Sequence, residues 1–287
     1  MLQKFKSATT YDEIQVRENP IKLKIMSFNV RYGTAKDGKN SWSHRRDLVF
    51  DLLKNSSCDI FGLQEALHFQ IEEIMEQLNH FGYIGKGRDD GKKSGEHNVI
   101  FYNPRKYKIL KSGTFWFSDT PSVAGSKHWG NKLPRICTWA HFWDRETSRD
   151  FYVYNVHLDH RNGSCRKKSI ELLCKKASQH EHKNTPYIVM GDFNVGEKNE
   201  IIHFLKGKNK INNSENPLIL EDTFRKLHPN ATGGTFHMFW GNKRGPKLDY
   251  IFATQKCSVL ESNIIRTNVN GKFPSDHFPI YSHLLLQ

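Results

Sequence analysis

The chain has 287 residues and a formal net charge of +13, with 43 Lys and Arg against 30 Asp and Glu. No apolar run approaches the ~18 residues that a membrane-spanning helix needs, and the N-terminus lacks the apolar core of a secretory signal, so we expect a cytoplasmic protein. Five scattered cysteines without a Cys-x-x-Cys pair argue against a disulfide framework and against a zinc site. The basic surplus predicts a polyanionic partner, such as nucleic acid, phosphorylated lipid headgroups or acidic metabolites, without choosing among them.

The first half of the chain alternates between strand and helix patterns. Residues 1–19 are polar and are predicted to form a flexible arm ahead of a single domain over residues 20–287. Strands are predicted over 23–30 and 58–63, because both are short apolar runs bounded by turn formers. Apolar residues at helical spacing predict helices over 43–55 and 67–78.

The second half continues this alternation. A glycine-rich loop from residue 85 leads into a strand at about residue 97, and its Arg88 either helps to cradle a phosphate or lies on a solvated surface. Further predicted strands are 107–111, 114–117, 134–143, 151–160, 187–190, 247–252 and 259–266, followed by an apolar strand at the C-terminus. Predicted helices cover 164–181, which is strongly basic, and 199–206. The alternation, without a repeat or a linker, favours one α/β domain.

Polar side chains gather where these strands end. Asp192 and Asn194 follow a buried strand in the sequence Gly-Asp-Phe-Asn, and on an extended chain their side chains leave the same face. A simple turn is the alternative, since all these polar types favour turns. Glu65 stands between a strand and a helix, where a helix dipole alone also favours a glutamate. Other polar residues at strand ends are Asn29, His157, Asp249, Asp276 and His277.

These residue types suit the cleavage of a phosphoester. Oxygen donors such as Glu65, Asp276 and Asn29 suit Mg²⁺, while histidines can hydrogen-bond a phosphoryl oxygen and transfer protons. Asp249 could hold a histidine in one tautomer, and Asp192 could align or deprotonate an attacking water.

Six short sequences carry a resemblance over residues 25–281. In order along the chain they are SFNV, GLQE, NVHLDH, GDFN, KLDYIF and SDHFPI. This pattern resembles the endonuclease/exonuclease/phosphatase superfamily, which includes deoxyribonuclease I, the exonuclease III-type apurinic endonucleases, deadenylases and neutral sphingomyelinases. The resemblance implies a four-layered α/β sandwich of two mixed β-sheets packed face to face and flanked by helices. It also implies a phosphoesterase that uses Mg²⁺ or Mn²⁺ at one rim of the sandwich.

The resemblance assigns roles to the matching residues. Asn29 and Glu65 would hold the metal, with Asp276 at the metal or just behind its ligands. Asp192 and Asn194 would position water and stabilise the transition state. His277, oriented by Asp249, would contact the scissile phosphate. The remaining implied positions are His157, which would aid protonation of the leaving group, and Tyr102 and Arg135, which are further candidates for phosphate contact.

Departures from the pattern argue against two branches of the superfamily but do not identify the substrate. The chain lacks the Cys-Asp-Arg sequence of inositol polyphosphate 5-phosphatases and the Asn-Gly-Leu/Ile-Arg sequence of apurinic endonucleases. We predict a monomeric phosphodiesterase of nuclease type, supported by the basic helix and by Lys243, Arg244 and Lys247. The alternative is a phosphomonoesterase or sphingomyelinase-like lipid phosphodiesterase, which a deep pocket walled by residues 88–96 and Trp129 would favour. A relative that binds phosphate without cutting it is a third hypothesis.

Overall fold

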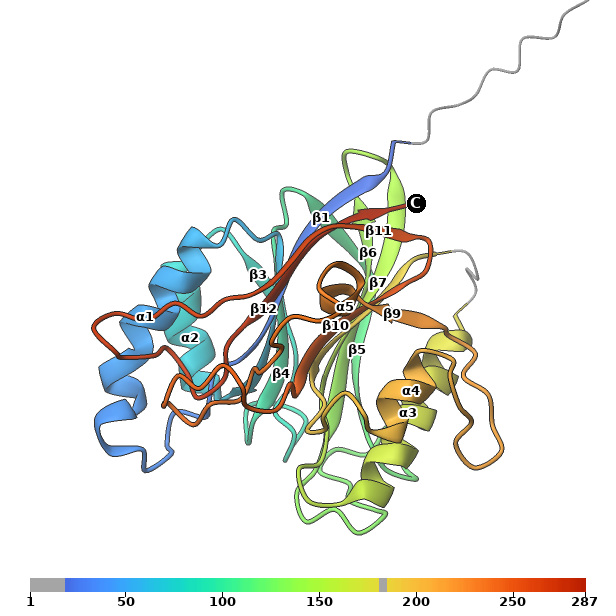
Figure 1. The fold of residues 1–287 in the computed structure, drawn as a ribbon, viewed down its shortest axis with the longest axis horizontal. Helices are drawn as coiled ribbons and strands as arrows, with labels where there is room; N and C mark the ends of the chain where they lie inside the picture. Colours follow the sequence, from blue (N-terminus) through green and yellow to red (C-terminus); the bar gives the residue numbers. More distant parts are fainter. Residues whose placement is uncertain (1–18, 181–184) are drawn as a thin grey trace, which may run out of the picture.

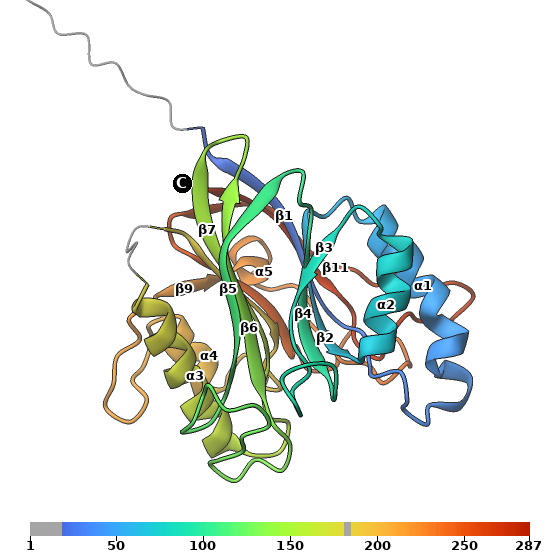
Figure 2. The ribbon, with the colours of Figure 1, turned by 180° about the vertical axis from the view of Figure 1, so that it is seen from behind.

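Two six-stranded mixed β-sheets pack face to face in the computed structural model, which describes residues 19–180 and 185–287 (Figures 1 and 2). The first sheet has the order β11-β12-β1-β2-β4-β3. Its strands are β1 (Ile21–Asn29), β2 (Ile60–Ala66), β3 (Gly82–Ile84), β4 (His97–Tyr102), β11 (Cys257–Ile264) and β12 (Ile280–Leu286). The second sheet has the order β5-β6-β7-β8-β10-β9. Its strands are β5 (Tyr107–Trp116), β6 (Ile136–Asp144), β7 (Arg149–His157), β8 (Tyr187–Asp192), β9 (Leu220–Asp222) and β10 (Asp249–Thr254).

Helices form the two outer layers. In Figures 1 and 2, α1 (Trp42–Asn55) and α2 (His68–Gln77) lie beyond the first sheet, and α3 (Gly163–Ser178) and α4 (Glu200–Leu205) lie beyond the second. The described residues also form two short helices, η1 (Gly38–Asn40) and α5 (Thr223–Leu227). The predicted four-layered sandwich is therefore confirmed. None of the helices within the described ranges is long and apolar enough to cross a membrane.

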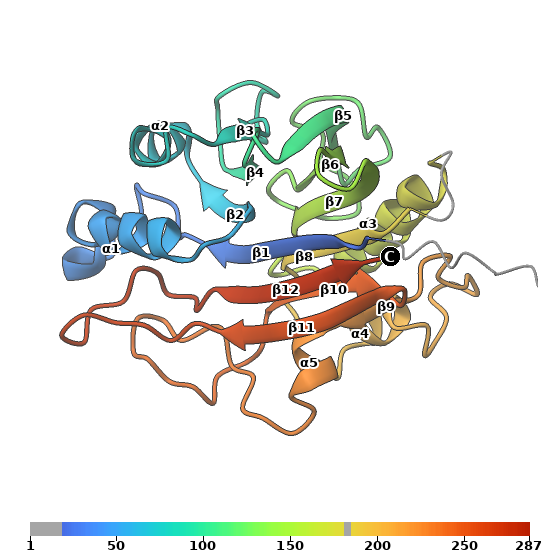
Figure 3. The same ribbon diagram turned by 90° about the horizontal axis from the view of Figure 1, so that it is seen from above.

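The sheets are buried on both faces, so their strands read as apolar runs rather than as a strict alternation. In β1, Leu23 and Ile25 enter the core between the sheets, whereas Met26 and Phe28 pack in the core that includes residues of α1 and α2. The view from above shows β1 of the first sheet running alongside β8 of the second (Figure 3). All five cysteines are buried and unpaired, as expected for reduced core residues.

The register of the central strands brings the predicted residues to one rim. β1 and β2 are parallel and place Asn29 beside Gln64. β7 and β8 are also parallel and place His157 beside Asp192, while the antiparallel β10 places Asp249 on the other side of Asp192. Residues far apart in sequence thus become neighbours because strand ends coincide at one edge of the sandwich.

A buried amide joins the two sheets just beneath this rim. Asn155 of β7 accepts a hydrogen bond from Nε2 of Gln64 at 2.7 Å, and its Nδ2 donates to the carbonyls of Leu63 at 3.0 Å and Val99 at 2.9 Å. These bonds satisfy backbone groups where the pairing of β2 with β4 shifts register between Leu63 and Ala66. The shift lets Glu65, whose φ is +62°, turn its side chain towards the rim.

Several predicted boundaries differ from the structure. The strands predicted over 107–111 and 114–117 form one strand, β5, with a register shift between Ile109 and Lys111 that interrupts the apolar pattern. The strand predicted over 151–160 ends at His157, because the carboxylate of Asp159 accepts two backbone N–H groups in a turn. β3, β9 and α5 were not predicted, since they have only 3, 3 and 5 residues. The predicted arm lies outside the described residues except for residue 19.

Candidate active site

A cavity of about 810 Å³, lined by charged and by apolar side chains, opens at the rim where both sheets end. Both sheets and the loops between their strands contribute to its wall. Eight of the predicted residues line it: Glu65, Arg88, Arg135, His157, Asp192, Asn194, Asp276 and His277. Asn29 and Asp249 lie directly behind them and are almost completely buried.

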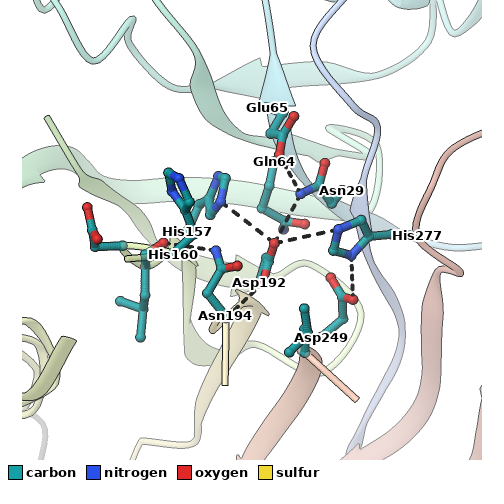
Figure 4. A network of polar contacts seen from close by, with 12 residues as sticks. Asn29, Gln64, Glu65, His157, His160, Asp192, Asn194, Asp249 and His277 are labelled. Atoms are coloured by element: carbon teal, nitrogen blue, oxygen red, sulfur yellow. Dashed lines mark hydrogen bonds and ion pairs between the residues drawn. The ribbon is translucent and has the colours of Figure 1, made fainter. Parts of the chain in front are cut away.

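Asp192 is the centre of this group (Figure 4). Its Oδ2 accepts a hydrogen bond from Asn29 Nδ2 at 3.1 Å and lies 3.6 Å from Nε2 of His157 and 3.9 Å from Nε2 of His277. Burial, followed by the like charge of Asp249, raises the pKa of Asp192 to about 7. A carboxyl group with this pKa can exchange a proton with water near neutral pH.

The residue before Asp192 has to be a glycine. Gly191 has a φ of +143°, and a Cβ at this position would lie 1.9 Å from the carbonyl oxygen of Val156 on the neighbouring strand. A side chain would therefore push β8 away from β7 and would separate Asp192 from His157.

His277 is held in one orientation by a buried carboxylate. Its Nδ1 lies 2.8 Å from Oδ2 of Asp249, which leaves Nε2 facing Asp192 and the cavity. Burial opposes the charged ring, but the charge of Asp249 and its hydrogen bond outweigh it and raise the pKa of His277 to about 10. The ring is thus a cation that can donate from Nε2.

His157 lies on the opposite side of Asp192 and has the opposite charge preference. Its Nδ1 is 3.9 Å from Oε2 of Glu96, and Arg135 and Arg88 are nearby. Burial, followed by the charges of these two arginines, holds the pKa of His157 well below its usual range. One neutral and one protonated imidazole therefore flank the same carboxyl group. Such a difference between the pKa values of two neighbouring groups is typical of acid–base sites.

Glu65 and Asn29 form the acidic corner of the cavity. Oε1 of Glu65 accepts from Asn29 Nδ2 at 3.0 Å, and Oε2 accepts from the backbone N–H of Tyr32 at 3.1 Å. The Oδ1 of Asn29 accepts from the backbone N–H of Arg31 at 3.0 Å. The amide thus bridges the carboxylates of Glu65 and Asp192 through its nitrogen, and its oxygen points to backbone. To bind a metal through its oxygen, as predicted, the side-chain amide of Asn29 would have to flip. Its Nδ2 would then lose the hydrogen bonds to Glu65 and Asp192.

Arg31 is a member of this corner that the sequence reasoning missed. Its guanidinium pairs with both carboxylate oxygens of Asp37 at 3.0 Å, and its Nε lies 3.8 Å from Oδ2 of Asp276. The hydrogen bond to Asp37, with the charges of Asp276 and Glu65, raises the pKa of Arg31. The signal for Arg31 was its place directly after the strand that carries Asn29. Arg31, Glu65 and Asn194 all have a positive φ, which is the kind of strained backbone found at functional sites.

The oxygen donors of Glu65 and Asp276 fit a hard divalent cation. Both carboxylates already face one cation, Arg31, and Mg²⁺ or Mn²⁺ prefers such oxygen ligands. A second possible grouping is Asp192, Asp249 and His277, whose ligand atoms lie within 4.8 Å of one another. In this grouping Nδ1 of His277 is already bonded to Asp249, so Nε2 would have to lose its proton to bind a metal.

Comparison with known proteins identifies the family. The model of the endonuclease/exonuclease/phosphatase family matches residues 26–277. The chain belongs to this family. A family protein of Bacteroides vulgatus is 32% identical with a TM-score of 0.84, over 93% of this chain and 100% of that one. A mannosyl-6-phosphatase of Bacteroides thetaiotaomicron is 33% identical with a TM-score of 0.82, over 92% of this chain and 100% of that one.

A nuclease is also among the relatives. The 3'-5'-exoribonuclease subunit Ccr4 of the CCR4-Not complex of Phaeosphaeria nodorum is 30% identical over 145 residues, which are 45% of this chain and 24% of that protein. Family membership makes this chain a phosphoesterase by descent, and the relatives differ in substrate.

Two aromatic residues that were predicted to line the substrate pocket lie away from the cavity. Tyr102 stands at the far end of β4 and packs against Phe142 with ring centroids 5.4 Å apart, because the antiparallel β4 runs away from the rim. Trp129 donates from Nε1 to Asp119 at 2.8 Å and does not line the cavity. Tyr102 as a phosphate contact and Trp129 as a pocket wall are therefore wrong; Leu133 lines the cavity instead.

An apolar loop, which was not predicted, forms one edge of the cavity, here called the apolar lip. Phe236, Met238 and Phe239 line the cavity, and the neighbouring Trp240 is 81% exposed. The backbone N–H groups of His237 and Met238 donate to the carbonyl of Asp276, so the loop is fastened to the segment that carries His277.

Lys247 does not support a polyanionic substrate, contrary to the sequence-based expectation. Its side chain is 1% exposed, and its Nζ lies 2.9 Å from Oδ2 of Asp222. Asp222 also caps α5 by accepting from the backbone N–H groups of Phe224 and Arg225. The pair is a structural element behind the site.

Replacing Lys247 with methionine is expected to lower the free energy of unfolding by about 3–5 kcal/mol, because Asp222 would remain as a buried charge without its partner. Urea unfolding measures the loss. The matched double variant Lys247→Met/Asp222→Asn keeps the cap on α5 and should recover most of the stability. A single variant as stable as the parent would contradict the buried-pair interpretation.

Proposed function

We propose that this family member hydrolyses phosphate esters with water and with Mg²⁺ or Mn²⁺ held by Glu65 and Asp276. The observation that carries the proposal is the position of Asp192 at the rim, where its buried Oδ2 lies 3.6 Å from Nε2 of His157 and 3.9 Å from Nε2 of His277. Burial also raises the pKa of this carboxyl group to about 7. Such a group can accept a proton from water while its neighbours handle charge on the phosphoryl group.

Each side chain has a role in this mechanism. Asp192 orients the attacking water and takes its proton. Nε2 of His277, held by Asp249, donates a hydrogen bond to a phosphoryl oxygen as negative charge develops. His157 faces the cavity from the opposite side, where its neutral ring can hydrogen-bond the leaving group, and the leaving group takes its proton from the protonated His277 or from bulk water. Asn194 lines the cavity, and its Nδ2 donates to the carbonyl of Leu158 at 3.0 Å, which fixes the side chain. A divalent cation at Glu65 and Asp276 would supply charge neutralisation at the phosphate.

Within this chemistry we propose a phosphodiester of nucleic-acid type as the substrate. A second hollow of about 580 Å³ shares Leu133, His160 and Arg161 with the cavity and also includes Lys132. A path lined by basic residues that continues out of the cavity suits an extended polyanion, as does the net charge of +13. The relation to Ccr4 supports the same substrate class.

A phosphomonoesterase is the second candidate. The mannosyl-6-phosphatase is similar over nearly the whole of both chains, which supports a phosphomonoester as the substrate. Release of product from single-stranded DNA, poly(A), bis-p-nitrophenyl phosphate, p-nitrophenyl phosphate and sphingomyelin separates the candidates. A preference for monoesters would rule out the nuclease proposal.

Chelation by EDTA is expected to reduce turnover of any active substrate to background, and excess Mg²⁺ or Mn²⁺ should restore it. Glu65→Gln removes a charged oxygen donor and should raise the metal concentration needed for half-maximal activity. The control is Glu146→Gln, an exposed carboxylate on the turn between β6 and β7. Turnover that persists in EDTA would overturn the metal-dependent mechanism.

A further inference from the structure

One wall of the cavity holds guanidinium nitrogens that lack hydrogen-bond acceptors within the described part of the chain. Arg88, Arg135 and Arg161 line it, and the carboxylates beside them are Glu96, Asp159 and Asp89, whose Oδ1 lies 3.9 Å from Nε of Arg88, beyond hydrogen-bond distance. Glu96 accepts from Nη1 of Arg88 at 2.6 Å. Oδ1 of Asp159 accepts the backbone N–H groups of Arg161 and Asn162, at 2.8 and 2.7 Å.

Arg135 is the least satisfied of the three. Its side chain is 3% exposed, and among the described residues neither Nε nor Nη1 has a hydrogen-bond partner. Oδ2 of Asp159 lies 3.8 Å from Nε, beyond hydrogen-bond distance. A buried guanidinium with two unpartnered nitrogens is costly unless an acceptor completes it.

His160 cannot supply the missing acceptors. Nη2 of Arg135 lies 2.8 Å from Nδ1 of His160, and Nε of Arg161 lies 3.0 Å from Nε2 of the same ring. A neutral imidazole has one nitrogen that accepts, and a protonated one has none. At least one of these guanidinium groups therefore lacks a true partner, and burial together with Arg135 lowers the pKa of His160, which disfavours its protonation.

This wall is separated from the reacting centre by the ring of His157. One edge of that ring lies 3.6 Å from Asp192, and the other lies 3.9 Å from Glu96, which is paired with Arg88. An anion on the arginines would therefore be distinct from the phosphate beside Asp192. Planar guanidinium groups bind phosphate oxygens in pairs, and Arg161 is exposed at the entrance.

We propose that Arg88, Arg135, His160 and Arg161 bind a second phosphate group of the substrate, next to the phosphate that is hydrolysed. The inference rests on the proposed function for the identity of the first phosphate. The second phosphate belongs either to the neighbouring link of a nucleic-acid strand or to a second phosphomonoester on a small molecule. On binding, it would accept from Arg135 and Arg161 and would end their competition for His160.

The test measures binding without turnover, by calorimetric titration of pyrophosphate and of inorganic phosphate in EDTA. We expect pyrophosphate to bind the parent protein at least about tenfold more tightly, and Arg161→Gln to weaken pyrophosphate by roughly tenfold or more, because a charged hydrogen bond is lost. Arg161 is exposed, so this variant should fold; thermal unfolding checks it. Arg105→Gln, which removes the same charge at an exposed site on another loop, should change affinity less than about twofold. Equal affinities in Arg161→Gln, Arg105→Gln and the parent would overturn the proposal.

Two further ligands identify the source of the second phosphate. A 5'-phosphorylated dinucleotide and a hexose bisphosphate are titrated in the same way, and the one that loses more affinity in Arg161→Gln names the source. If neither loses affinity, the second-phosphate site is wrong. These titrations need neither metal nor catalysis, so a protein that binds pyrophosphate through Arg161 but cleaves no ester would contradict the proposed function and leave this inference standing.

Discussion

Asp192→Asn is expected to lower turnover by about 10²–10⁴-fold, the usual contribution of a positioned general base. The asparagine has the same shape and can still accept from Asn29, but it cannot take a proton from water. Initial rates on the most active ester of the substrate panel measure the effect. Asn199→Ala is the control. It changes the N-cap of α4, in the loop that links β8 to α4, and its activity should stay near that of the parent. An Asp192→Asn protein with more than a tenth of parental activity would remove Asp192 from its catalytic role.

The same variant has a distinct effect on stability. The pKa of Asp192 is raised from its usual value near 4 to about 7, so the folded protein holds a proton that the unfolded chain releases. The contribution of Asp192 to stability is therefore present at low pH and lost as the pH rises from about 4 to about 7. In EDTA, Asp192→Asn should flatten this fall and be at least as stable as the parent above pH 7. Urea unfolding across this range tests it, and a destabilised variant at pH 8 would show that the charge is better compensated than its burial indicates.

Asp249→Asn is expected to reduce turnover by about 10³–10⁴-fold. The new amide can donate to Nδ1 of His277, which would move the ring proton to Nε2 and leave the ring neutral. Without the carboxylate, the protonated ring that faces the phosphate would lose its main stabilisation. Measurements of turnover against pH in the variant and the parent check this, because the variant should lose activity at neutral pH while Asn263→Asp, at an exposed position of β11, should not.

Alkaline stability provides a second readout of the same pair. The pKa of His277 is raised from about 6.5 to about 10, so the pair stabilises the fold fully below about pH 6.5, and this contribution is lost as the pH rises to about 10. The parent should therefore lose stability over this window in EDTA, and Asp249→Asn should lose less. Parallel pH dependences in the two proteins would show that Asp249 does not set the charge of His277.

The basic residues at and near the cavity differ in how well the sequence alone predicts their positions. Arg88 and Arg135 could be nominated because they stand near glycines or in a matching strand. His160 and Arg161 follow the NVHLDH sequence directly, yet only the turn at Asp159 brings them back over the cavity. For Lys247 the sequence was misleading in the opposite direction. This lysine lies next to a motif of the site, but it is buried against Asp222. Asp222 belongs to a strand too short to be predicted from an apolar pattern.

The sequence by itself determined the family, the layered α/β architecture and most of the polar residues at the rim. It could do so because strand ends are marked by local patterns, and because residues such as Asp192, Asp249 and His277 stand at those ends. Only the tertiary structure decided which of them meet and with what charge. Parallel pairing puts His157 beside Asp192, burial makes one histidine neutral, and Asp249 keeps the other protonated. The direction of β4 takes Tyr102 away from the site. These outcomes depend on register, burial and neighbours from distant segments, which local sequence does not encode.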